Sequence, residues 1–512
     1  MSDLLDQPWD FIVIGTGMGG GTIGRVLAEA GLRVLFVEKG PAGYRAEQQA
    51  IHSEVFLPEA RLARGFWPEP MRATIGGVTQ DFFAPIGAGV GGSSAFYAAT
   101  LERPEPHDLS ADWPISYAAM RDAYAKAEEM FAVCGEPDPL SDEVETLRSP
   151  PPLAATDAAL IAELRASGLN PYRLHAALKY LPGCADCLGR KCPRACKMDG
   201  RSAGVEPALA TGHAALIDMC DVTRLHSDGR RITGLTVARG GALRHVKANR
   251  VILAGGALGS AHLMLASASE TAPSGIANAS GLVGRNLMFH LNEMFALWPR
   301  TRQIDPAPSK AISLRDLYHM DNQRFGTVQS LGVDAGYGEI LHYLRLMLGR
   351  SRLRHIPGAH DLARIPAALA ERFMGQAKIF VGLLEDIGYP ENRVLYDAQR
   401  PGALTVEYRI KDELIVRRRA FRKALRKALP RHRKMFLSMA PELNFGHPCG
   451  TARMGLDPAK SVLRPDCRAH ELTNLWVVDS SFMPSSFGVN PSLTIAANAL
   501  RVGEILIKEM RR

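Results

Sequence analysis

The sequence has no long apolar run. No window of its 512 residues approaches the roughly 18 to 20 uninterrupted apolar residues that a membrane helix needs. The opening MSDLLDQPWD carries acids where a secretory signal has a basic region and an apolar stretch. We therefore expect a cytoplasmic protein without a transmembrane segment. With 46% hydrophobic residues, the chain is long enough to bury the core of a multidomain enzyme.

Cysteine is scarce and unevenly placed, which argues against a secreted disulfide framework. Four of the eight cysteines are scattered, and the other four form a C-x2-C-x4-C-x3-C pattern: Cys184, Cys187, Cys192 and Cys196. Four thiolates this close in sequence suit one metal ion or an iron–sulfur cluster. The spacing matches neither standard ferredoxin pattern, so a metal-free turn remains an alternative.

Acidic residues are too few to balance the bases, and the net charge is +8. The excess is concentrated between Arg350 and Lys434 without a recognisable nucleic-acid module, so we expect no nucleic-acid partner. The most basic stretch, Leu414 to Leu429, has helical spacing and ends before Pro430. Its charges fit a solvated helix face, or a peripheral contact with an anionic membrane or an acidic redox partner.

A dinucleotide-binding pattern is present near the start. DFIVIG reads as a strand and is followed by a glycine-rich helix start and a second strand. Gly15, Gly17 and Gly20 form GxGxxG, with Met18 inside the pattern, and Glu38 closes the second strand. The glycines permit a tight turn and close approach of a pyrophosphate to the helix N-terminus. Glu38 can accept hydrogen bonds from a ribose and argues against NADP.

A second glycine-dense segment, IGAGVGGSSAFYAAT, is more than one nicotinamide-binding unit requires. Together with the first pattern it resembles the glucose-methanol-choline (GMC) oxidoreductase family, which carries FAD. The resemblance implies that this segment lies along the flavin and pyrophosphate. It assigns four residues to FAD binding: Gly89, Gly91, Gly92 and Ser94.

Three further segments are similar to the family in order. CDVTRLHSD resembles the strand that meets the adenine near Val222, and RVILAGGALGSAHLM resembles the next cofactor-domain strand and helix, with Gly255 and Gly256 at their junction. VGRNLMFH, residues 283 to 290, matches a recurrent segment that we interpret as architectural.

The resemblance implies a fold of mixed α/β and α+β class. A discontinuous Rossmann-like FAD-binding domain is expected over 1–115, 200–295 and 440–512. A substrate-binding domain with a β-sheet and helices is expected over 116–199 and 296–439. The sheet pattern that returns near the C-terminus, NLWVVDSSF, supports a cofactor domain built from separate segments.

The C-terminal motifs carry the catalytic residues by resemblance. GHP places a catalytic base at His447, and GVNP places its partner at Asn490. The resemblance also implies that Asn490 and Pro491 contact the cofactor. A base is required because an alcohol that keeps its proton is a poor hydride donor, and histidine has a suitable pKa. Asn490 cannot titrate, so we expect it to position the substrate oxygen. Asp479, after the strand LWVV, is expected near the cofactor, or as a simple helix cap.

The sequence therefore predicts an FAD-dependent oxidoreductase acting on the CH–OH group of a sugar, an aminosugar or a polyol-like alcohol. The cofactor is expected to be bound noncovalently. A sterol, an aryl alcohol or a choline-like compound is the alternative substrate, and oxygen and a redox partner are both open as electron acceptor. A flavin-carrying electron-transfer subunit is the alternative from another class. A nicotinamide-dependent dehydrogenase is disfavoured by the second glycine segment and by the His447 and Asn490 motifs.

Overall fold

The computed structural model describes residues 4–43, 58–109, 112–184, 186–300, 310–320, 323–332, 336–350, 356, 358–375 and 377–512. Its helices are α1 Met18–Glu29, α2 Pro58–Ala63, α3 Tyr117–Met130, α4 Ala155–Ala166, α5 Glu206–Ala210, α6 Gly256–Ala266, α7 Tyr337–Arg350, α8 Ala359–Leu362, α9 Arg364–Met374, α10 Asp412–Ala428 and α11 Ser492–Met510. Short turns of helix are η1 Leu4–Asp6, η3 Gly92–Ala95, η4 Pro106–Asp108, η5 Gly200–Val205 and η7 Ser480–Phe482.

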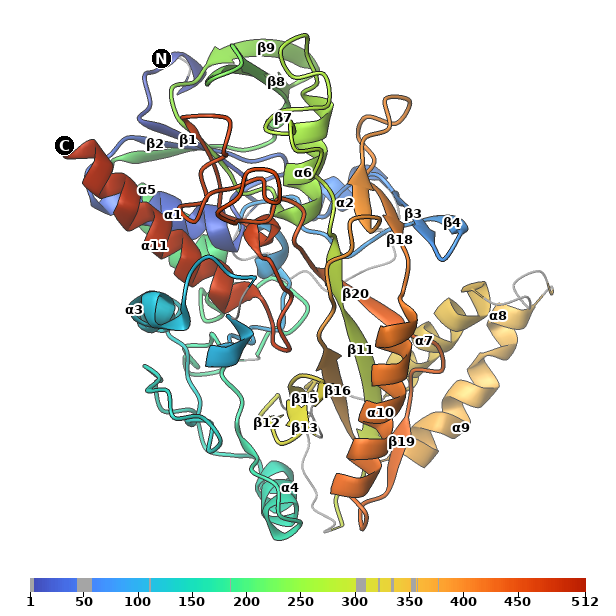
Figure 1. The fold of residues 1–512 in the computed structure, drawn as a ribbon. Coiled ribbons are helices and arrows are strands. Elements are labelled where there is room, and N and C mark those ends of the chain that lie inside the picture. The colour runs from blue at the N-terminus through green and yellow to red at the C-terminus, as the bar shows by residue number, and fades with distance from the viewer. Residues whose placement is uncertain are drawn as a thin grey trace.

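A five-stranded sheet forms the cofactor half of the molecule. Its order is β21-β10-β1-β2-β6, and every neighbouring pair is parallel. The strands are β1 Phe11–Ile14, β2 Val34–Val37, β6 Ala214–Ile217, β10 Val251–Leu253 and β21 Leu475–Val477. The sequences FIVI and VLFV of β1 and β2 are apolar throughout and buried on both faces, as parallel strands covered by helices require. α1 and α11 run side by side along this sheet (Figure 1).

A seven-stranded sheet forms the other half. Its order is β19-β11-β16-β15-β12-β5, with β20 also paired to β11. The strands are β5 Tyr172–Arg173, β11 Met288–Leu297, β12 Ile312–Leu314, β15 Val328–Ser330, β16 Lys378–Leu384, β19 Lys434–Phe436 and β20 Glu442–Cys449. α10 packs on this sheet through Leu414, Phe421 and Leu425, which belong to one buried cluster with Phe380. The expected helix at the basic stretch is therefore present.

Three smaller sheets complete the fold. β3 Met71–Ile75, β4 Val78–Phe82, β17 Arg393–Leu395 and β18 Thr405–Tyr408 form one, β7 Asp221–Ser227, β8 Ile232–Arg239 and β9 Ala242–Lys247 form a second, and β13 His319–Met320 and β14 Gln323–Arg324 form a third. α7, α8 and α9 form a helical arm at the side of the molecule, away from the five-stranded sheet (Figure 1). None of the helices in the described ranges has both the length and the apolarity to cross a membrane.

The observed fold is the expected mixture of α/β and α+β structure, with the five strands of the Rossmann-like sheet drawn from separated segments. The expected domain boundaries remain a prediction. Two strands of the seven-stranded sheet, β11 and β20, lie wholly or partly in the ranges that were expected for the cofactor domain.

Candidate active site

The first glycine turn joins β1 to α1. Gly15 has φ +95°, and a Cβ there would lie 2.5 Å from the carbonyl oxygen of Ala254. A Cβ on Gly20 would lie 2.1 Å from the carbonyl oxygen of Gly15, so helix and turn meet at backbone distance. Gly17 has more space, because a Cβ there would have the Cα of Gly92 as its nearest neighbour, 4.0 Å away. No side chain caps α1 at Gly17, which leaves its first amides for an anion such as a pyrophosphate.

The second glycine segment lies against the first. A Cβ on Gly92 would come within 3.0 Å of the Cα of Gly17, and both Gly91 and Gly92 have positive φ. Ser94 lies in η3, where its hydroxyl donates to the carbonyl of Gly91 at 2.6 Å and accepts from the amide of Gly200 at 2.9 Å. Gly89 continues the same loop and packs near Pro41. The two predicted glycine segments thus form one cradle of bare backbone, which fits FAD.

Thr16 connects the two segments, and the sequence reading did not identify it. Its hydroxyl donates to Glu38 Oε2 at 2.5 Å and accepts from the amide of Gly91 at 3.2 Å. Glu38 also accepts from the amides of Thr16 and Gly40, at 3.1 and 3.2 Å. Burial raises the pKa of Glu38, and the hydrogen bonds from Thr16 and Gly40 oppose this rise. Glu38 therefore holds the glycine turn in place as well as lying where a ribose is expected.

Three further residues predicted to bind the cofactor are buried. Met18 is the buried first residue of α1, and Val222 is a buried residue of β7, two positions after Cys220, whose amide donates to the carbonyl of Glu38 at 2.9 Å. Asp479 accepts from the Ser260 hydroxyl at 2.5 Å. Burial raises the pKa of Asp479, and the hydrogen bonds to its carboxylate oppose the rise.

Asp479 also caps a short helix, which was the alternative role expected from sequence. Its carboxylate accepts from the amides of Ser481 and Gly256, at 2.9 and 3.0 Å, and it is the N-cap residue of η7. The same carboxylate therefore holds η7 to the start of α6, at the carboxyl ends of the central strands where ligands of such sheets bind. Pro491 is the N-cap residue of α11.

A bulge in β20 presents His447. β20 pairs with β11 at Asn444↔His290 and at Cys449↔Met288, so five residue steps on β20 face two on β11. The extra residues include Gly446 and His447, which the bulge turns out of the regular ladder. Bulges of this kind re-aim side chains beside active sites.

His290 connects the two predicted catalytic motifs. Its Nδ1 lies 3.0 Å from His447 Nδ1, and its Nε2 lies 3.0 Å from the carbonyl oxygen of Phe487, three residues before Asn490. Burial lowers the pKa of His290 to about 4, so its ring is neutral and carries one proton. A carbonyl oxygen can only accept, so that proton lies on Nε2 and Nδ1 of His290 is an acceptor.

The tautomer of His447 follows from this chain. His447 Nδ1 must donate to His290, which leaves Nε2 of His447 with its lone pair. Asn444 Nδ2 also lies 3.1 Å from His447 Nδ1, but an N–H donated there would require a lone pair on the same atom. We assign the Nδ1 proton of His447 to the bond with His290. The Asn444 amide does not need His447 as an acceptor, because it can donate to Asn292 Oδ1 at 3.3 Å.

Asn490 is held by Gln329 of β15. Gln329 Nε2 donates to Asn490 Oδ1 at 3.0 Å, and both side chains are largely buried. This bond leaves the Asn490 amide nitrogen to donate to another group. Sequence reasoning missed Gln329 because it lies in the region where no motif was recognised.

Burial is the main cause of the low basicity of the site. Burial, followed by His290 and Lys310, holds the pKa of His447 well below its usual value of 6.5. Burial likewise lowers the pKa of Lys310 to about 7, against an opposing effect of Glu102. The imidazole of His447 is therefore neutral throughout the neutral pH range, as a proton acceptor must be.

The four clustered cysteines pack together on a separate loop. Cys184 Sγ and Cys196 Sγ are 3.1 Å apart, yet no three sulfur atoms of these four cysteines come within 4.8 Å of one another. Burial raises the pKa of Cys184 to about 12 and raises that of Cys187 as well. A tetrahedral zinc site would bring all sulfurs to about 3.8 Å. The thiols would have to rearrange to bind such an ion.

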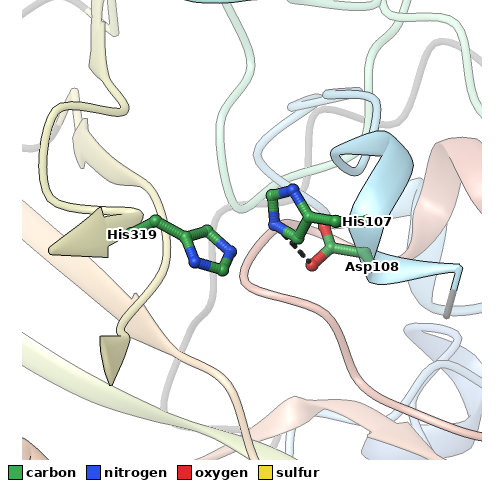
Figure 2. Close-up of side chains that lie close together, drawn as sticks. All are labelled: His107, Asp108 and His319. Carbon is green, nitrogen blue, oxygen red and sulfur yellow. Dashed lines mark ion pairs between the residues drawn. The ribbon is translucent and has the colours of Figure 1, made fainter. Parts of the chain in front are cut away.

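His107, Asp108 and His319 are a group of possible metal ligands at the junction of η4 and β13 (Figure 2). His107 Nε2 lies 3.5 Å from Asp108 Oδ1, and the two imidazole rings meet edge to face. Arg324 donates to the same Asp108 oxygen, and Tyr318 donates to the other at 2.6 Å. Because a guanidinium already neutralises this carboxylate, the group suits an internal ion pair better than a metal cation.

Known proteins match this chain over nearly its whole length. Two family models, both described as GMC oxidoreductase, match residues 9–292 and 395–499. Paromamine 6'-oxidase of Streptomyces fradiae is 28% identical over 97% of this chain and 91% of that protein. 2-Methyl-1,2-propanediol dehydrogenase of Mycolicibacterium austroafricanum is 26% identical over 99% of this chain and 96% of that protein. An FAD-dependent oxidoreductase structure from Chaetomium thermophilum has a TM-score of 0.65 at 15% identity, covering 98% of this chain and all of that one.

Proposed function

Since the chain belongs to the GMC oxidoreductase family and is an FAD-dependent alcohol oxidoreductase, we propose that it oxidises a CH–OH group of an aminosugar, sugar or polyol-like alcohol. Two similar proteins are named as oxidases of paromamine and of 6'''-hydroxyparomomycin C, and a third as a dehydrogenase of 2-methyl-1,2-propanediol. The polar groups of the predicted site support the same class, because the Gln329–Asn490 pair and Lys310, whose charge acts on His447, suit a substrate with several hydroxyl groups.

His447 is the proposed base. The observation that carries this role is the chain from the carbonyl of Phe487 through His290 to His447 Nδ1, at 3.0 Å for each contact. It leaves the lone pair of His447 Nε2 to take the hydroxyl proton of the alcohol. FAD, when bound, accepts the hydride from the alcohol carbon. Proton removal at Nε2 raises the hydride-donating power of that carbon.

Asn490 is the proposed positioning partner. With its Oδ1 bonded to Gln329, its amide nitrogen is directed to donate to the substrate oxygen. Such a bond fixes the orientation of the reacting C–H without a change of charge. Gln329 acts through Asn490 and is a positioning residue in the same sense.

The glycine cradle supports noncovalent FAD binding. Gly17 and Gly92 approach each other at backbone distance, and the uncapped start of α1 provides amides for the pyrophosphate. Met18, Glu38, Val222, Asp479 and Pro491 are proposed to contact or support the cofactor. The electron acceptor, oxygen or a redox partner, and the cellular compartment stay predictions from sequence.

The cysteine cluster stays a prediction of a metal or iron–sulfur site. Its support is the packing of all four thiols in one loop. The Lys197 ammonium ties this loop to the second glycine segment, because it donates to the carbonyls of Cys187 and Ala95, each at 3.0 Å. Elemental analysis of the purified protein decides between the two interpretations. About one metal or one cluster per chain supports ligation, and none after aerobic and anaerobic purification supports a metal-free turn.

The decisive experiment is an anaerobic titration of the purified flavoprotein with aminosugars, sugars, polyols, choline and sterols, followed by flavin absorbance. We expect one polar class to bleach the flavin, and His447→Ala to slow the bleaching by about 100-fold or more. Asn490→Ala should slow it by about tenfold or more with FAD retained. His213→Ala, at an exposed position, is the matched control and should behave as the wild type.

Two results would count against this proposal. Bleaching by a sterol or choline alone would move the substrate to the alternative class. Bound flavin that no alcohol reduces would favour a flavin-carrying electron-transfer subunit.

A further inference from the structure

An apolar ridge runs along the outer face of the helical arm. Leu362, Ile365, Leu369 and Phe373 are 62, 63, 65 and 54% exposed. The last three recur at four-residue spacing, which places them on one face of α9, and Leu362 ends α8 just before it. Ala363, Ala367 and Met374 form the opposite, buried face. Single exposed apolar residues are ordinary, but a row of four large ones over three turns marks an interaction surface.

The ridge ends at a strongly basic turn. The Phe373 ring lies 5.8 Å from the Trp298 ring and 4.4 Å from the Arg433 guanidinium, centroid distances that join α9 to the turn between α10 and β19. Between Ala420 and Ala440 the sequence has no acid. The exposed bases of this segment are Lys423, Arg426, Lys427, Arg431 and Arg433. The sequence from Tyr337 to Gly375 has six arginines against three acids.

The contacts of α10 separate the bases that hold it to the sheet from the bases that are exposed. Arg418 and Arg422 both bond the buried carboxylate of Glu293, and Arg417 donates to the backbone carbonyl of Glu385. The C-terminal end of the helix is different, since Arg426 and Lys427 are exposed and lead into the basic turn. The positive surface is thus concentrated beside the Phe373 end of the ridge.

We propose that the α8–α9 ridge and the basic turn after α10 dock the protein on an anionic lipid bilayer. The ridge belongs to an arm at the side of the molecule (Figure 1), and its four side chains are more than half exposed. Apolar side chains flanked by arginine and lysine are the composition of interfacial helices. The basic rim adds attraction to acidic headgroups.

A second copy of the chain fits this surface less well. A parallel pairing of two such faces would bring two basic turns together, and any self-association brings together chains that each carry a net charge of +8. Charge complementarity therefore favours acidic lipid over self-association. The inference does not depend on the reaction that the enzyme catalyses, and its test needs no substrate.

The test is flotation of the FAD-loaded protein with vesicles of phosphatidylcholine alone, or with about 30% phosphatidylglycerol. We expect the protein to float with the anionic vesicles, and the double variant Ile365→Gln, Leu369→Gln to reduce the bound fraction about tenfold. Lys427→Gln with Arg431→Gln should weaken binding at low salt and remove its salt dependence. Leu243→Gln with Leu456→Gln makes the same change at exposed sites outside the arm and should leave flotation unaltered.

Flavin absorbance and turnover in solution should be equal in all these variants, which shows that they are folded. Wild-type protein that remains unbound with every vesicle overturns the proposal, as does equal flotation of the ridge variant. Light scattering provides a third outcome. A wild-type dimer that becomes a monomer in the ridge variant would assign the ridge to a second copy and overturn lipid docking.

Discussion

At the scale of single residues, His290 has the least expected position. It ends the segment VGRNLMFH, which the sequence reading interpreted as architectural, and it is fully buried between His447 and Phe487. A neutral imidazole with one nitrogen on a carbonyl must accept with the other. The protonation site of the proposed base is therefore set by a residue that touches neither substrate nor FAD in our proposal.

His290→Gln tests this role. Gln can still donate to the Phe487 carbonyl but offers no acceptor to His447 Nδ1, so we expect kcat to fall about 10- to 100-fold with FAD still bound. His290→Asn places an amide oxygen near the former Nδ1 and should recover part of the rate. Stopped-flow flavin reduction measures both. Equal losses in both variants, together with lost FAD, would mean that His290 is only structural.

The pH dependence of kcat/KM follows from the lowered pKa of His447. A base with a depressed pKa stays neutral to lower pH, so activity should be constant through neutrality and fall only well below pH 6.5. Lys310→Met removes a positive neighbour, which raises the pKa of His447 and should move the acid limb up by about half a unit or more. Lys310→Arg keeps the charge and should keep the limb. An acid limb at or above pH 6.5 in the wild type would contradict this view.

A residue's task can be predicted from sequence where that task is local. The glycines of both segments are required by backbone contacts of their own turns, and such requirements are visible as a spacing. Thr16, His290 and Gln329 act through partners 22 to 161 positions away. Their roles follow from strand pairing and from a bulge, which no single segment of sequence encodes.

At the scale of elements, α10 is held to the seven-stranded sheet by charge as well as by apolar packing. Glu293 of β11 is fully buried, and its two oxygens accept from Arg418 at 2.5 Å and Arg422 at 2.6 Å. Sequence periodicity predicted the helix, but it could not separate buried from solvated arginines. That separation depends on the acid of a distant strand.

Glu293→Gln should lower the free energy of unfolding by about 3 kcal/mol, because it leaves two guanidiniums without their shared carboxylate. Urea unfolding followed by circular dichroism measures the change. Lys423→Gln, on the exposed side of the same helix, is the control and should stay within about 0.5 kcal/mol. A loss below about 1 kcal/mol for Glu293→Gln would show that apolar packing alone holds α10.

At the scale of the whole molecule, the cofactor site is assembled from distant parts of the chain. β1, β2, β6, β10 and β21 span residues 11 to 477, and the glycine cradle joins residues 15 to 20 with residues 89 to 94 and 200. A ligand held by all these segments binds the folded chain and not the unfolded one. FAD is therefore expected to stabilise the fold as a whole.

Apoprotein supplied with FAD at about 1,000 times its Kd should gain about 4 kcal/mol against unfolding. Riboflavin, which lacks the pyrophosphate and adenosine, should give much less stabilisation at the same concentration, because the amides of α1 and the glycine cradle serve the missing part. Thermal unfolding with each ligand measures the difference. Equal stabilisation by riboflavin would place the binding energy at the flavin ring and away from the cradle.

β11 has a consequence for recombining this enzyme with its relatives. Within one strand, His290 bonds His447 and Glu293, three residues later, bonds the arginines of α10. A chimera that exchanges the substrate-facing half should therefore cross over after Leu297 and inherit α10 from the same parent as β11. A crossover inside the strand would combine His290 from one parent with Glu293 and α10 from the other. A new substrate preference would then come with an unintended change in the base.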